Sequence, residues 1–392
     1  MSASLVGSEM CIRDSMYILA LYRLISGMGY FVIPYLSLFL TNELTISVIV
    51  AGSIVAGANF LCIPTLYISG RITEKIGPKK TIIISQILAA MSYILVVICP
   101  VNYIKVCFAV LGLCFASVVV PAMDAWATIK NPDEDRRKAF SLLYLSQNIG
   151  FAIGSLIIGV AYKTNPNLVF IGDAITTLLA VGMIYVCTEK TDTEVFCEGA
   201  VQTGRKDIKI NKAIKIFMLI ILLNALAYGQ LTFMLPLFLE KVATSGTILY
   251  GFIMAINAIL VITLSPIFTE VLKETKLIDV LILSELLFAI GYGAYTFAHR
   301  NTVLLMITIV WSVGEVLFSI NHMAYIVHNV EEAAVPRVTS MAASFNKAGG
   351  ILSSIIGGAL VSGIGFSKSW TCISLLVFVS TGMGIYIKKL DK

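Results

Sequence analysis

The chain has 392 residues, of which 58% are hydrophobic and 13% charged, and it carries a net charge of +5. Its mean hydropathy is +0.91. Soluble domains are about half apolar and about a quarter charged, so this composition excludes an ordinary soluble protein and indicates a membrane protein.

Apolar runs long enough to cross a bilayer follow one another along the chain. A membrane-spanning helix needs about 20 mostly apolar residues, because lipid offers no hydrogen-bonding partner to an open backbone. We therefore predict an all-α membrane protein with twelve transmembrane helices. The expected helices are residues 16–40, 46–68, 81–99, 103–126, 139–162, 168–187, 213–239, 247–269, 277–298, 302–326, 338–362 and 369–387.

Two segments fall outside these helices. Residues 1–15 lack the basic start, apolar core and cleavage site of a signal peptide, and we interpret them as a non-native leader before a start near Met16. A short native leader is the alternative. Residues 188–212 are polar and mixed in charge, which predicts a cytoplasmic linker. This linker divides the chain into an N-terminal six-helix bundle, 16–187, and a C-terminal six-helix bundle, 213–392.

The basic residues predict the orientation. With the amino terminus in the cytoplasm, most of the 28 Lys and Arg residues fall in cytoplasmic loops and the tail, as do Lys79, Arg136 and Lys388. The positive-inside rule then predicts a multi-pass protein of the cell membrane with both termini cytoplasmic. The basic face matches anionic lipid head groups, so no nucleic-acid partner is needed to explain the charge.

The two halves repeat each other at a distance of about 200 residues, as in transporters built from duplicated helical units. This repeat predicts two pseudo-symmetric six-helix bundles. The corresponding pairs are Gly27 and Gly229, Pro34 and Pro236, Gly150 and Gly349, Ser155 and Ser354, Gly159 and Gly358, and Glu74 and Glu274.

The stretch SGRITEKIGPKK, residues 69–80, resembles the signature Gly-x-x-x-Asp-Arg-x-Gly-Arg-Lys of the major facilitator superfamily. The helix count, the central linker and the repeat extend this resemblance over the whole chain, and it implies the major facilitator fold. The matching positions are Gly70, Gly77 and Lys79, with Glu74 in place of Asp, Lys75 in place of Arg, and Pro78 departing from the second Arg.

The resemblance implies that this loop is a conformational latch. Gly70 would permit close helix approach, Glu74 would face a helix amino terminus in the other half, and the basic residues would pair across the cytoplasmic face. An acid at a helix amino terminus is favoured by about 0.3–1 kcal/mol, so such a contact can bias a switch without preventing it. Pro78 removes one expected cation, so either the latch is weaker or Lys80 takes that place. The alternative is an ordinary positive-inside loop.

A second motif lies in the fifth helix. Gly150, Gly154 and Gly159 are similar to the Gly-x-x-x-Gly-Pro-x-x-Gly-Gly motif of the family's drug and proton antiporters, with Ser155 in place of Pro. Small residues at this spacing allow close helix packing in any membrane bundle. The Arg that those antiporters carry in the fourth helix is replaced by Phe108.

Ionisable residues inside the helices are the best guides to a site, because each costs at least about 2.5–3.5 kcal/mol in hydrocarbon. Glu315 falls near the middle of helix 302–326. The resemblance implies that helices 1, 4, 7 and 10 line a central cavity. Low dielectric favours the neutral form of a lone carboxylate, so Glu315 is the first candidate for proton exchange or for binding a cationic substrate. A structural hydrogen bond is the alternative.

Two further charges face the same predicted cavity. Arg23 in the first helix and Asp124 in the fourth could form an ion pair at the cavity floor or an anion site. Asp124 could equally pair with Arg71 or Lys75 of the latch.

Helix 213–239 carries a polar stripe of Asn224, Tyr228 and Gln230. These residues could hold substrate, although hydrogen bonds between helices are the commoner use of such groups. Glu285 and Lys347 lie in helices that support the core, where a local ion pair or snorkelling would explain them.

Soluble-enzyme chemistry is poorly represented, and we predict that the chain is not an enzyme. His322 and His328 are not spaced to share a helix face, and the Cys residues form no CxxC pair, so neither a metal site nor a cofactor is expected. The segment GAVQTGRK lacks the Lys and Ser or Thr of a phosphate loop, which argues against ATP. A proton or another ion remains as the energy source.

The sequence therefore predicts a monomeric secondary active transporter of the major facilitator type. Proton-coupled efflux of amphipathic, drug-like or metabolite compounds by alternating access is favoured, because the cavity helices carry few hydrogen-bonding groups. Uptake or exchange of a small polar solute, such as a sugar, amino acid or organic anion, is the first alternative. A polytopic membrane enzyme or a receptor would need clustered catalytic residues or a larger soluble domain.

Overall fold

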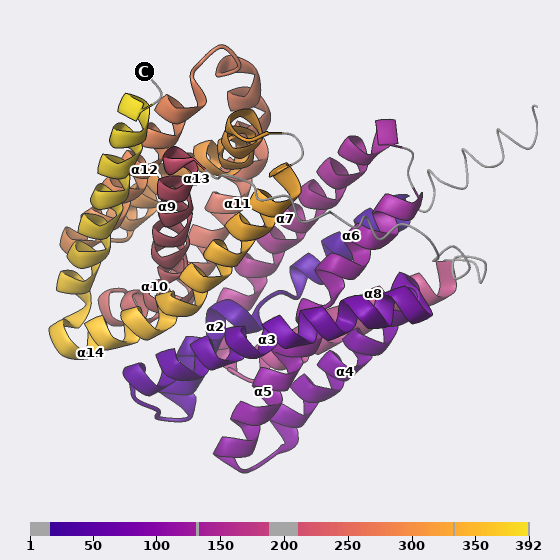
Figure 1. Ribbon diagram of the computed structural model, residues 1–392. Helices are drawn as coiled ribbons and strands as arrows, with labels where there is room; N and C mark the ends of the chain where they lie inside the picture. Colours follow the sequence, from indigo (N-terminus) through magenta and orange to yellow (C-terminus); the bar gives the residue numbers. More distant parts are fainter. Residues whose placement is uncertain (1–15, 131–132, 188–210, 299, 332–333, 391–392) are drawn as a thin grey trace, which may run out of the picture. The chain divides into compact units, whose positions relative to one another are not determined.

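The computed structural model describes residues 16–130, 133–187, 211–298, 300–331 and 334–390. These described residues are helical almost throughout, with no strand among them (Figure 1). Within them, 11 helices are long and apolar enough to cross a membrane. The last of these, Arg337–Leu390, contains two of the expected spans, so the prediction of an all-α membrane fold is confirmed.

The first half of the chain begins with a broken span. Residues 16–28 are helical, residues 29–31 form a turn, and the helix resumes as α2 (Val32–Leu38) and one π-helical turn, η1 (Phe39–Glu43). The following helices are α3 (Val48–Ile76), α4 (Pro78–Ile98), α5 (Asn102–Ser117), α6 (Val119–Lys130), α7 (Asp133–Thr164) and α8 (Leu168–Cys187).

The described part of the second half is also a series of helices. Its first span consists of two consecutive helices that meet at Gly229, where φ of −62° and ψ of −17° stay helical. The helices are α9 (Lys212–Tyr228), α10 (Gln230–Val242), α11 (Gly246–Val271), α12 (Leu277–Ala294), the short η3 (Tyr295–Phe297), α13 (Asn301–Asn329) and α14 (Val335–Leu390).

Gly365 divides α14 into two spans. Its φ of 76° and ψ of 171° lie outside helical geometry, in a region that only glycine enters readily. The predicted helices 338–362 and 369–387 fall on either side of this residue, which is why an apparently continuous helix counts as two membrane crossings.

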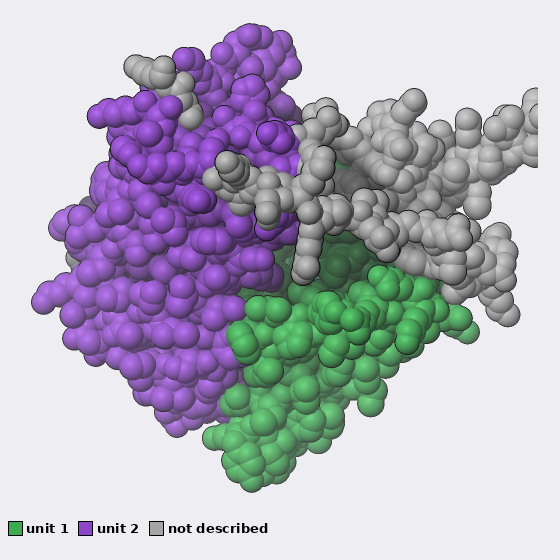
Figure 2. Space-filling model, viewed as in Figure 1, with its two compact units in different colours: residues 1–33, 58–201 green, residues 34–57, 202–392 purple. Residues whose placement is uncertain are grey.

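By their contacts, the helices form two compact units (Figure 2). Unit 1 consists of residues 1–33 and 58–201, and unit 2 of residues 34–57 and 202–392. The end of the first span and the start of α3 thus group with the second half of the sequence. The predicted leader and all but the last two residues of the predicted linker lie outside the described residues.

Unit 1 is built around large side chains that its helices share. Tyr22, Met123 and Trp126 are almost fully buried in one cluster formed by residues 16–28, α4, α6, α7 and α8. In unit 2, Trp370 of α14 packs against Phe238, with ring centroids 6.1 Å apart, and against Tyr295 at 4.7 Å. Such interdigitated cores position the polar groups described below.

The same close crossing occurs in both units. A Cβ atom at Gly150 would clash with the carbonyl oxygen of Leu24, and one at Gly349 would clash with that of Leu222. Nearby, Ser155 donates a hydrogen bond to the carbonyl of residue 152 at 3.0 Å, and its counterpart Ser354 bonds residue 351 at 3.4 Å. The repeat seen in the sequence thus corresponds to repeated packing of the fifth helix on the first and the eleventh on the seventh.

The glycines of the fifth helix differ in what surrounds them. A Cβ atom at Gly154 would clash with the carbonyl oxygen of Met28, so this residue, like Gly150, lies at a crossing too close for a side chain. Gly159 is buried.

Candidate functional site

Glu315 lies at a junction of three helices in unit 2. It extends from α13, and the hydroxyl of Tyr228 on α9 donates a hydrogen bond to its Oε1 at 2.9 Å. The side-chain amide of Asn257 on α11 donates to its Oε2 at 2.5 Å and to Ser312 Oγ at 3.1 Å. The candidate carboxylate therefore has one neutral donor on each oxygen.

The surroundings of Glu315 are polar but uncharged. No ion pair of the described residues involves it, and its residue is only half-buried. Tyr228 is 38% exposed, so the hydroxyl end of the cluster is more open than the Asn257 end, which is buried. A carboxyl group in this setting can hold a proton or attract a cation, because no basic side chain in the described part of the chain pairs with it.

The polar stripe predicted on the seventh helix does not form one site. Only Tyr228 reaches Glu315. The amide of Asn224 donates instead to Glu285 Oε1 on α12 at 2.8 Å. The amide of Gln230, which is fully buried, donates to the carbonyl oxygen of Ser353 at 2.8 Å and thus joins α10 to α14.

Two members of the Glu315 cluster were missed in the sequence. Asn257 and Ser312 are short polar residues in strongly apolar helices, and neither carries a charge that would draw attention. The signal in the sequence was the lone Asn in the run MAINAILVI, since an amide in hydrocarbon requires a partner.

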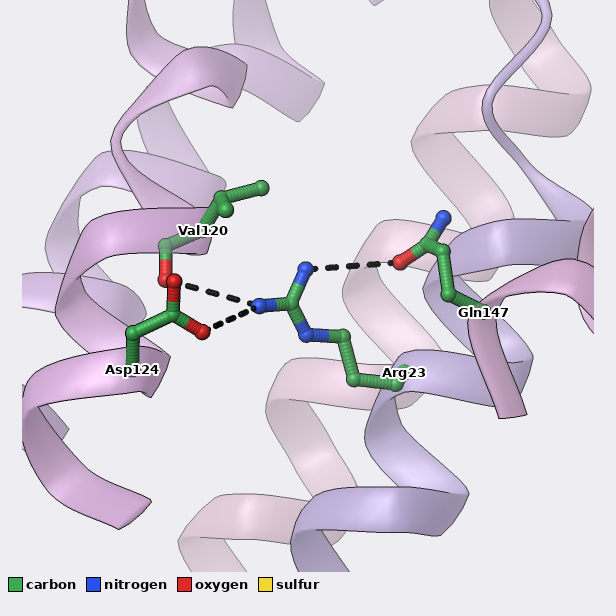
Figure 3. Close-up of polar contacts among 4 residues, drawn as sticks. All are labelled: Arg23, Val120, Asp124 and Gln147. Carbon is green, nitrogen blue, oxygen red and sulfur yellow. Dashed lines mark hydrogen bonds and ion pairs between the residues drawn. The ribbon is translucent and has the colours of Figure 1, made fainter. Parts of the chain in front are cut away.

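Arg23 and Asp124 pair within unit 1 (Figure 3). Arg23 Nη2 donates to Asp124 Oδ1 at 3.0 Å and to the carbonyl oxygen of Val120 at 3.4 Å, while Nη1 lies 3.5 Å from Gln147 Oε1. The Arg23 side chain is 8% exposed and that of Asp124 is 45% exposed. Of the two pairings that the sequence left open for Asp124, the one with Arg23 is present.

The residues of the predicted latch lie where α3 meets α4. Gly70, Glu74 and Lys75 are exposed on the last turns of α3, and Lys79 is half-buried in the first turn of α4. Gly77 joins the two helices with a φ of 82°, a left-handed conformation that favours glycine. A Cβ atom at Gly70 would meet open space, so no close helix approach occurs there within the described residues.

A carboxylate that the sequence analysis overlooked holds the break in the first helix. Asp173 on α8 is buried, accepts a hydrogen bond from Thr177 Oγ1 at 3.3 Å, and lies beside the backbone N–H groups of Phe31 and Val32. The turn at residues 29–31 interrupts the helix and turns these N–H groups toward Asp173, while the Phe31 N–H also donates to the carbonyl oxygen of Gly29 at 2.7 Å. Asp173 therefore has a structural role, satisfying groups that lipid could not.

No group of three or more metal-ligating side chains occurs among the described residues. The arrangement is that of a multi-pass helical membrane protein with isolated, neutral-partnered carboxyl groups inside its spans. This class includes ion-coupled transporters, in which intramembrane acids bind protons or ions.

The comparisons define the family. The model of the Major Facilitator Superfamily matches residues 19–278, and the chain belongs to this superfamily of membrane transporters. It is 22% identical over 355 residues to the uncharacterized MFS-type transporter YqjV of Bacillus subtilis (strain 168), covering 88% of this chain and 85% of that protein. It is 21% identical over 300 residues to a Na(+), Li(+), K(+)/H(+) antiporter of Planococcus maritimus, covering 68% and 70%.

A solved structure supports the fold. The chain resembles a POT family transporter in complex with 5-aminolevulinic acid with a TM-score of 0.81 at 12% identity, over 97% of this chain and 100% of that one. The predictions of the family and of its fold are confirmed. The protein is thus a multi-pass membrane transporter, and its substrate is expected to be a small molecule.

Proposed function

We propose that this transporter exports amphipathic, drug-like or metabolite compounds in exchange for protons, with Glu315 as the coupling residue. The observation that carries the proposal is the position of the Glu315 carboxyl group within α13, bonded by Tyr228 and Asn257 and by no cation among the described residues.

The coupling follows from the chemistry of this carboxyl group. When it is protonated, it is neutral and its burial costs little. When the proton leaves, the charge is stabilised only by two neutral hydrogen bonds, so a cationic or polar substrate group or another proton is attracted. Exclusive binding of proton or substrate at one group is the simplest basis for exchange.

The amphipathic substrate is supported by the apolar character of the helices that carry the site. The spans of α11 and α13 are both strongly apolar. Proton exchange is supported by the relative from Planococcus maritimus, whose name describes exchange of monovalent cations for protons. That relative makes a monovalent cation a further candidate for the exported ion.

Uptake or exchange of a small polar solute is the second candidate. The observation in its favour is that Tyr228, Asn257 and Ser312 gather around Glu315, which makes this region more polar than the sequence suggested. A polar solute could bond several of these groups at once.

We further propose the cell membrane as the location, with both termini cytoplasmic, and the loop 69–80 as the latch. The bacterial relatives and the distribution of Lys and Arg support the location and orientation. The latch is supported by its match to the family signature.

The proposal is tested with purified protein in liposomes that contain a pH-sensitive dye. Lipophilic cations, monovalent metal ions, sugars, amino acids and peptides are added in turn under an imposed proton gradient. Proton movement triggered by lipophilic cations supports drug export. Movement triggered only by metal ions or only by polar solutes refutes it in favour of the corresponding alternative.

A further inference from the structure

Glu285 is a second intramembrane carboxyl group, separate from the Glu315 cluster. It lies on α12 and is 2% exposed, which makes it more deeply buried than Glu315. The amide of Asn224 on α9 donates to its Oε1 at 2.8 Å. Its Oε2 is buried and has no hydrogen-bond partner among the described residues.

The groups around Glu285 do not neutralise it. Ser380 of α14 lies beside the carboxyl group, and its Oγ is also buried without a partner in the described part of the chain. Tyr292 lies about two turns further along α12 on the same helix face. Its hydroxyl is also buried and has no hydrogen-bond partner among the described residues. Tyr292 lies within the electrostatic reach of both Glu285 and Glu315.

No cation of the described residues faces Glu285 from the elements packed against α12. Those elements are α13, α14 and η3, together with α9 through Asn224. On α13 the nearest acid is Glu315, and η3 contributes Tyr295. On α14, Lys347 is exposed and Lys388 pairs with Asp279 at 2.7 Å, at the amino-terminal end of α12.

A buried carboxyl group with one donor and no counterion is stable only when it is neutral. A proton on Oε2 would convert that unpartnered acceptor into a donor, for which the Ser380 hydroxyl is an available acceptor. The hydroxyl could instead donate to an anionic Oε2, but that bond would leave a buried charge held by two neutral donors and no counterion, so the absence of a cation among the described residues favours the protonated form.

We propose that Glu285 is a second proton-binding site of this transporter, connected to the Glu315 site through the last turn of α9. Asn224 and Tyr228 are one helical turn apart on α9, and each donates to one of the two carboxyl groups. This turn ends at Gly229, where α9 meets α10. A change of charge at either carboxyl group thus acts on the same helix end.

The role of this site in transport rests on the proposed function, whereas proton binding by Glu285 does not. The test is infrared spectroscopy of purified protein in lipid bilayers, which reads the C=O absorption of protonated carboxyl groups. The decisive comparison is Glu315→Gln against the Glu315→Gln, Glu285→Gln double variant, because it isolates Glu285 from the other acids. Gln is nearly isosteric and keeps an oxygen for Asn224.

The expected result is a protonated-carboxyl band at neutral pH that is present in Glu315→Gln, falls as the pH is raised, and is lost in the double variant. Asn224→Ala should move this band to higher frequency, because the C=O group loses its hydrogen bond. Identical spectra of the single and double variants at all pH values would overturn the proposal. If the double variant does not fold, Glu285→Asp in the Glu315→Gln background serves, since the band should then move rather than disappear.

The experiments distinguish a failure of the proposed function from a failure of this proposal. Loss of proton exchange at Glu315 would appear in the liposome measurements and would leave the Glu285 band unchanged.

Discussion

At the scale of single residues, the carboxyl groups of Glu315 and Glu285 each depend on donors from other helices. Glu315 was recognised because a charge inside an apolar run is conspicuous, but its donor Asn257 comes from another helix about 60 positions away in the chain. Asn224 and Tyr228 share a helix face, yet they bond different carboxyl groups because different helices pack beside consecutive turns. Sequence spacing fixes the face of a helix and does not identify its neighbour.

The pairing of Arg23 with Asp124 is expected to stabilise unit 1. Asp124→Ala leaves Arg23, whose side chain is 8% exposed, without its anion. Breaking a fully buried pair costs about 3–5 kcal/mol, and the partial exposure of Asp124 reduces the expected loss of unfolding free energy to about 1–3 kcal/mol. Chemical denaturation of the detergent-solubilised protein measures this change.

The matched control is Asp279→Ala, which removes a more exposed pair with Lys388 and should cost less than about 1 kcal/mol. If Asp124→Ala destabilised the protein no more than this control, the ion pair would have no structural importance.

Asp173 is expected to stabilise the turn that breaks the first helix at residues 29–31. Asp173→Leu removes the acceptor of the Thr177 hydroxyl and the carboxylate beside the Val32 N–H group, at about 1–3 kcal/mol in total, since the Phe31 N–H keeps its bond to Gly29. Asp173→Asn retains a carbonyl oxygen and should be milder. The midpoint of thermal unfolding is expected to be highest for the wild type, lower for Asp173→Asn and lowest for Asp173→Leu. Equal midpoints for the Asn and Leu variants would contradict the role of Asp173 as an acceptor.

At the scale of helices, the hydropathy pattern located the spans well and their ends poorly. The helix expected at residues 46–68 is α3, which continues to Ile76 through the charged turns before Gly77. Hydropathy detects the part of a helix that lies in lipid, and a helix does not stop where the lipid does. The interruption at residues 29–31 was not predicted, because a backbone break leaves the apolar composition unchanged.

Two glycines of unit 1 are expected to respond in opposite ways to replacement by Ala, because only one of them lies at a close helix crossing. Gly150→Ala should destabilise the protein, because its Cβ would clash with a backbone oxygen of Leu24 that cannot move aside alone. Gly182→Ala on α8 meets open space and should be neutral or stabilising by about 0.5–1 kcal/mol, since Ala favours the helix. Thermal unfolding of both variants measures the difference. A Gly150→Ala protein as stable as Gly182→Ala would disprove close packing at this crossing.

At the scale of the whole molecule, the family could be predicted from one loop, one repeat and the number of apolar runs. Each of these reflects a constraint that survives sequence change: helix length matched to the bilayer, and small residues where helices cross. The grouping of residues 34–57 with the second half could not be predicted, because it depends on contacts made only in the folded chain. The substrate likewise depends on side chains that several helices bring together.

The latch is a prediction at this scale, because it concerns interconversion of states. Neutralising Glu74 should change the transport rate by up to about fivefold, the equivalent of a contact worth about 1 kcal/mol, and leave substrate affinity unchanged. Glu43→Ala, an exposed acid in η1, is the control. Transport kinetics of Glu74→Ala that match those of Glu43→Ala would count against the latch.

The most direct test of the whole account is transport by Glu315→Gln in liposomes. With a substrate from the panel, we expect this variant to retain exchange of labelled for unlabelled substrate, because the helices around the site stay in place. Transport driven by a proton gradient should be lost, along with its dependence on pH. If Glu315→Gln still accumulated substrate against a gradient with the pH profile of the wild type, Glu315 would not be the coupling residue.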